Sequence, residues 1–90
     1  MANRYYQRTG EILKQEGQDR WSIYNPERRG WEETERAKEA YETAFQDPFH
    51  QISGEQALKA TAERQQRYNQ WKEQYKRDNP EKFRRYFPTD

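Results

Sequence analysis

Apolar residues along the chain recur mostly at spacings of three and four, the period of an amphipathic α-helix. Over residues 3–16 the positions that fall on one side are Tyr5, Tyr6, Thr9, Ile12 and Leu13. Gly17 offers a helix stop, although Gly10 within the stretch costs about 1 kcal/mol relative to alanine. The spacing therefore predicts a first helix, which begins either near Asn3 or at a Thr9 N-cap.

The next stretch, residues 18–30, mixes large apolar residues with Gly, Asp, Asn and Pro. This mixture predicts an irregular segment whose rings pack beneath neighbouring helices, because a single short strand there would have no partner. Asn25 followed by Pro26 has the form of an N-cap and a first helical position. Gly30 interrupts that pattern, so the next helix is expected to begin near one place or the other.

Two long helical patterns follow, over residues 31–46 and 53–77. The first gathers Trp31, Ala37 and Tyr41 on one side and ends at Asp47 and Pro48, because proline disfavours helical geometry at the residue before it. The second opens with Ser53-Gly-Glu-Gln56, the form of a capping box. Only about six residues join the two patterns, which predicts an antiparallel helical hairpin.

A short terminal helix is expected after Asn79 and Pro80, with three rings on one face before Pro88 closes it. Together these pieces predict an all-α fold: a small helical bundle built on an antiparallel helical hairpin with short N- and C-terminal helices. At 90 residues the chain is expected to form one helical domain over residues 1–90.

Composition limits how such a bundle could form a core. Hydrophobic residues make up 30% of the chain and charged residues 37%, with a mean hydropathy of -1.77. Three Trp, seven Tyr and four Phe supply most of the apolar bulk, and each ring buries about 150–250 Å². The core is therefore expected to be aromatic, and the fold to be marginally stable or supported by self-association.

Several function classes lose support at this stage. The chain has no cysteine, no apolar stretch of membrane-spanning length and no apolar run typical of a secretory signal, which predicts a cytoplasmic protein with no membrane partner. His50 is the only histidine, and no phosphate-binding loop, nucleophile elbow or two-histidine metal spacing is present. We therefore predict no enzyme activity, no catalytic or metal site and no cofactor.

The leading functional prediction is a small non-enzymatic protein–protein interaction module: an adaptor, inhibitor or accessory protein of the kind that phages and bacteria encode. Its partner would be another protein or a second copy of the chain, bound through charged and aromatic helix faces. One face is a ridge of carboxylates. A metal site is disfavoured there, because hard cations need preorganised oxygens. The ridge is therefore expected to be an ordinary charged surface or a docking face for a basic partner. The predicted partner-binding residues are Phe83, Tyr86, Phe87, Glu32, Glu35, Glu39 and Glu42.

The alternative prediction is a nucleic-acid-binding helical domain that uses the basic C-terminal third. Between positions 64 and 86 the chain holds eight basic residues and three acidic ones, a net charge of +5. Aromatic residues are interleaved with these cations, a combination that suits phosphate neutralisation and base stacking. The residues that would contact nucleic acid are Arg64, Arg67, Lys72, Lys76, Arg77, Arg84 and Arg85.

Overall fold

An antiparallel β-sheet lies at the centre of the molecule, so the all-α helical bundle predicted from the sequence is wrong. The structure is a computed structural model and describes residues 3–88. Within this range the strands are β1 (Asn3–Arg8), β2 (Glu11–Glu16), β3 (Arg20–Asn25), β4 (Gly30–Glu33) and β5 (His50–Ile52), and the helices are α1 (Glu35–Glu42), α2 (Gly54–Asp78) and α3 (Pro80–Tyr86). The strands form one sheet in the order β4-β3-β2-β1-β5, with antiparallel pairing throughout.

The predicted N-terminal helix is in fact the β1–β2 hairpin, in which Tyr6 lies opposite Leu13. Gly10 has a φ of +78° in the two-residue connection between the strands, a conformation that glycine adopts without strain. Adjacent apolar pairs such as Ile12 and Leu13 point to opposite faces of a strand. Both of these residues are buried, because helices cover both faces of this sheet.

The irregular segment predicted for residues 18–30 is also wrong, since Arg20–Asn25 forms β3 and Gly30 begins β4. This strand pairs with β2 on one side and with β4 on the other, so it has the partners that the sequence pattern did not reveal. Trp21 and Ile23 alternate along it with Ser22 and Tyr24, the period of two typical of a strand.

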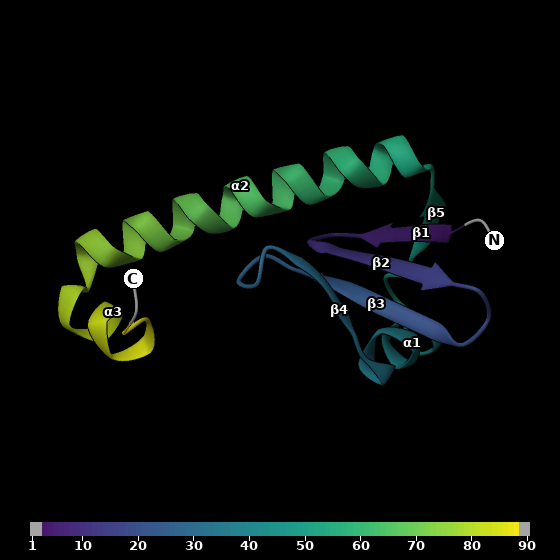
Figure 1. The fold of residues 1–90 in the computed structure, drawn as a ribbon, viewed down its shortest axis with the longest axis horizontal. Helices are drawn as coiled ribbons and strands as arrows, with labels where there is room; N and C mark the ends of the chain where they lie inside the picture. The colour runs from purple at the N-terminus through teal and green to yellow at the C-terminus, as the bar shows by residue number, and fades with distance from the viewer. Residues whose placement is uncertain (1–2, 89–90) are drawn as a thin grey trace.

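The two main helices lie on opposite faces of the sheet and do not form a hairpin with each other (Figure 1). Trp31 belongs to β4, and α1 begins only after the Thr34 N-cap. Between α1 and α2 the chain adds β5 to the outer edge of β1. The α1 face of the sheet holds the main core cluster, which consists of Tyr6, Leu13, Trp21, Ala37 and Phe49.

The first half of α2 packs on β1 and β2, where Ala57 and Ala60 are buried. Its predicted capping box is confirmed: Ser53 and Gln56 exchange side-chain-to-backbone hydrogen bonds of 3.1 and 2.8 Å. Gln65 then ties the middle of the helix to the β3–β4 hairpin, since its amide oxygen accepts from the Tyr24 hydroxyl at 2.7 Å. The rest of α2 runs past the sheet (Figure 1).

The short C-terminal helix predicted from the sequence is confirmed as α3, which turns back against the end of α2. Phe83 is buried in this contact and stacks on Phe87 with ring centroids 5.0 Å apart. We call residues 64–88, the second half of α2 together with α3, the C-terminal hook. None of the helices in the described range combines the length and the apolar character required to span a membrane.

Candidate acidic groove

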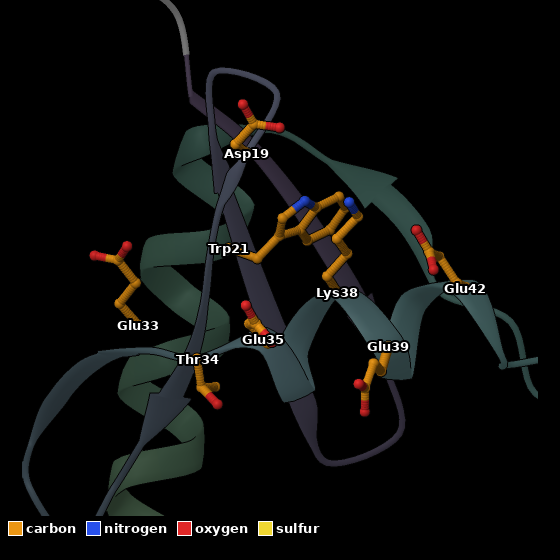
Figure 2. Close-up of a pocket in the computed structure, with 8 residues that line it drawn as sticks. All are labelled: Asp19, Trp21, Glu33, Thr34, Glu35, Lys38, Glu39 and Glu42. Atoms are coloured by element: carbon orange, nitrogen blue, oxygen red, sulfur yellow. The ribbon is translucent and has the colours of Figure 1, made fainter.

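A groove of about 870 Å³ lies between α1 and the adjoining ends of β3 and β4. We call it the acidic groove, and its lining residues are Asp19, Trp21, Glu33, Thr34, Glu35, Lys38, Glu39 and Glu42. Figure 2 shows the Trp21 indole and the Lys38 side chain in the middle of this set, with carboxylates around them. Five of the eight lining residues are acidic.

Thr34 holds the start of α1 against β3. Its backbone N–H donates to the Trp21 carbonyl at 3.1 Å, and its side-chain oxygen accepts from the Arg36 backbone N–H at 3.2 Å. These two bonds set the direction in which α1 leaves the sheet. Because residues three and four apart share a helix face, the carboxylates of Glu35, Glu39 and Glu42 then line the same side of the groove.

Trp21 forms the apolar wall of the groove. Its side chain packs against both Tyr6 and Tyr41, with ring centroids 5.7 and 5.1 Å away, and the residue is 6% exposed. The indole Nε1 is buried and finds no hydrogen-bond acceptor among residues 3–88. A buried N–H without a partner costs about 1–3 kcal/mol. The core therefore holds an unpaired donor on the side chain that forms the groove wall.

The charge of the groove is strongly unbalanced, since five carboxylates face one ammonium, a net charge of -4. Glu33 approaches Arg20 at 3.8 Å, but the other four carboxylates form no ion pair within the described residues. Glu42 also lies in the last turn of α1, where no basic residue accompanies it. An anion at a helix C-terminus is unfavourable by about 0.3–1 kcal/mol. Glu42 therefore does not stabilise the helix, whereas Glu35 lies in the first turn, where the dipole favours an anion.

The carboxylates are spread along the groove and are not gathered at one point. Across residues 3–88, no three or more His, Cys, Asp or Glu side chains come together in a way that could hold a metal ion. His50 is exposed on β5, opposite Gln7, and it does not line the groove. The geometry therefore suits an elongated cationic ligand better than a single ion.

The structure brings together three of the four glutamates predicted to bind a partner. Glu32 is separate: it lies on β4, and its carboxylate accepts from the Asn25 side-chain amide at 2.7 Å. The helical pattern did not reveal Asp19, Trp21 or Glu33, because their place in the groove depends on the register of β3 and β4. The alternation of Trp21 and Ile23 with polar residues was the one signal that could have placed this segment in a strand.

The predicted aromatic surface at the C-terminus is only partly accessible. Phe83 is buried and Phe87 is half-buried, whereas Tyr86 is 65% exposed. Of the residues proposed to contact nucleic acid, Lys72 lies over the Phe87 ring at 4.6 Å and Lys76 over the Phe83 ring at 5.5 Å. Of the other residues in this set, Arg64 is half-buried. The exposed ones are Arg67, Arg77, Arg84 and Arg85.

Comparison with known proteins gives no relative from which a function could be carried over. No family model, no curated protein and no solved structure matches the chain. Function is therefore inferred from the acidic groove and the C-terminal hook themselves.

Proposed function

We propose that this chain is a non-enzymatic protein-interaction module whose acidic groove binds a basic segment of a partner protein. One observation carries the proposal: four carboxylates without ion pairs line the same groove as Trp21, whose buried indole N–H has no acceptor. The carboxylates attract Lys or Arg side chains, and the N–H needs an oxygen. A peptide supplies both, because its backbone carbonyl accepts while its side chains carry the charge.

Arginine fits such a groove better than lysine does. Its planar guanidinium carries five donors and can bind two carboxylate oxygens at once, and it also stacks on aromatic rings. Carboxylates on α1 line the groove, and the ring of Tyr41, which is 38% exposed, contacts its Trp21 wall. Lys38 is the competing internal cation, since it is exposed and lines the same groove.

Isothermal titration with an amidated peptide that alternates Arg and Gly tests this proposal, with a Glu–Gly peptide as the control ligand. The Arg peptide is expected to bind and the Glu peptide to give no signal. The double variant Glu39→Gln/Glu42→Gln should weaken binding about five- to tenfold, because each partly exposed charge pair contributes up to about 1 kcal/mol. Lys38→Met should strengthen binding, since it removes the internal cation.

The matched control is the double variant Glu27→Gln/Glu63→Gln, which neutralises two exposed glutamates that do not line the groove. This variant should bind the Arg peptide as the unaltered chain does. If both double variants lose the same affinity, the attraction arises from total charge and the proposed groove is not the site.

Nucleic-acid binding is the second candidate function, and one observation favours it. Trp71 is 51% exposed on the C-terminal hook and stands between the rings of Tyr68 and Tyr75, with centroids 5.8 and 5.4 Å away. Such a ladder of rings beside cations suits single-stranded nucleic acid. Retention of a labelled oligonucleotide that falls steeply with salt, and that Trp71→Ala reduces, would support this function. No retention at low salt would remove it.

A further inference from the structure

We infer that the acidic groove of one molecule receives the last turn of α3 from a second copy of the same chain. This inference rests on the proposed function, because it names one basic segment that the groove would bind. The hook carries a net charge of +5 and the groove -4, whereas the whole chain carries only +1. Two copies therefore repel each other little, but their opposite ends attract.

The last turn of α3 offers the two groups that the groove lacks. Arg84 and Arg85 are both exposed there and supply guanidinium groups for the carboxylates of α1. The last carbonyls of a helix have no donor within it. The Arg84 carbonyl cannot accept a helical hydrogen bond, because the residue four positions later is Pro88, which has no N–H. A carbonyl acceptor and two cations thus lie together at one helix end.

The contact must be between molecules. Figure 1 shows α3 beyond the sheet at the far end of α2, whereas α1 packs against β3 on the other sheet face. The ring of Tyr86 is 65% exposed beside the two arginines, and Tyr41 is 38% exposed beside the groove. Tyr and Arg are the residue types that most often dominate the binding energy of interfaces.

A groove that binds a hook is a heterologous contact, since the two surfaces differ. It closes as a symmetric dimer if the second copy returns its own hook to the first groove, or as a larger ring if the rotation between copies closes. Otherwise the same contact continues into open chains. Both outcomes depend on the same residues, and both weaken with salt because the surface charges are screened within about 10 Å at 0.1 M ionic strength.

Sedimentation velocity over a range of concentrations at low and high salt provides the test. The unaltered chain is expected to associate at low salt and to dissociate as salt is added. Glu39→Lys/Glu42→Lys and Arg84→Glu/Arg85→Glu should each weaken association at least tenfold, because each places like charges across the contact. An equimolar mixture of these two variants should associate again, because the reversed charges complement each other. Circular dichroism of each variant confirms that it is folded.

Two controls distinguish this inference from the proposed function. Arg28→Glu, an exposed arginine in the β3–β4 connection, should leave association unchanged. The monomeric Arg84→Glu/Arg85→Glu variant should still bind the Arg peptide, since its groove is intact. A chain that stays monomeric at low salt but binds this peptide would overturn the inference alone. Association that survives both charge reversals would also overturn it, and failure of peptide binding in the hook variant would instead contradict the proposed function.

Discussion

Trp21 belongs to both the core and the groove, and these two roles place different demands on its indole ring. The core needs the apolar ring, which packs against both Tyr6 and Tyr41. It gains nothing from Nε1, which is buried without an acceptor. The unsatisfied N–H destabilises the free protein, and a ligand that accepts a hydrogen bond from it removes that cost. The same position can therefore reveal whether the groove binds a ligand.

Trp21→Phe is expected to leave the free energy of unfolding within about 1 kcal/mol of the unaltered chain. The smaller ring loses packing, but the unsatisfied donor, which costs about 1–3 kcal/mol, is removed. Binding of the Arg peptide should weaken about three- to tenfold, the loss of one hydrogen bond. Thermal unfolding and titration measure the two effects, and an affinity equal to that of the unaltered chain would show that Nε1 does not contact the ligand.

Lys14 tests the electrostatics of the opposite sheet face. Its ammonium lies 2.9 Å from the Glu16 carboxylate and 5.0 Å from the Trp31 ring centroid. The hydrogen bond and the charge of Lys14 hold the pKa of Glu16 below its ordinary value of 4.5. Lys14→Gln should therefore raise this pKa, as followed by the carboxyl carbon shift of Glu16 during an NMR titration.

The same pKa shift gives a sign for the pH dependence of stability. A carboxyl whose pKa is lower in the folded state stabilises the fold above its unfolded pKa, and this contribution is lost as the pH falls through the folded pKa. The unaltered chain should thus lose more stability than Lys14→Gln as the pH falls below about 4.5. Equal losses in acid unfolding would mean that the Lys14–Glu16 pair contributes nothing in solution.

At the scale of the elements, local signals identified the C-terminal half of the chain but not the N-terminal half. A capping box and a proline at the first helical position mark α2 and α3, and they act within one helical turn. The β1–β2 hairpin has apolar pairs spaced seven apart, which fit a helix face as well as a strand covered on both sides. Gly10 distinguishes the two possibilities, because glycine destabilises the interior of a helix but adopts the positive φ of a hairpin turn without strain.

Only the part of the candidate site that lies on a single helix could be predicted from the sequence. The glutamates of α1 follow from helical spacing, so the sequence pattern identified them as a charged surface. The wall formed by Trp21 depends on β3 packing against α1, a contact between segments that the sequence pattern assigned to other structures. The orphaned indole nitrogen is a property of three-dimensional packing, so no sequence pattern could have indicated it.

The acidic end of α1 gives a prediction in which stability and function change in opposite directions. Glu42 lies in the last turn of α1, where the helix dipole disfavours it; Glu39, three residues before it, repels it and Lys38, four residues before it, offsets that repulsion. Glu42→Gln should stabilise the fold by about 0.3–1 kcal/mol, measured as a rise in Tm, and weaken binding of the Arg peptide. A variant that loses both stability and affinity would show that Glu42 supports the fold itself.

At the scale of the whole molecule, the sheet separates two surfaces of opposite charge. The groove lies on the α1 face, while α2 crosses the other face and carries the basic hook away from it (Figure 1). Gln65 anchors this arrangement, since its side chain contacts both Tyr24 and the Pro26 carbonyl on the β3–β4 hairpin. The molecule thus has one acidic and one basic end, although its net charge is only +1.

The most direct test of the groove is the indole N–H signal of Trp21 in a two-dimensional NMR spectrum of the nitrogen-15-labelled Arg84→Glu/Arg85→Glu variant, recorded while the Arg peptide is added. The chain has two other tryptophans, Trp31 and Trp71, which do not line the groove and serve as internal controls. We expect the Trp21 signal to move downfield as its nitrogen gains an acceptor, while the other two stay in place. A Trp21 signal that does not move at saturating peptide, or a shift confined to Trp71, would contradict the account.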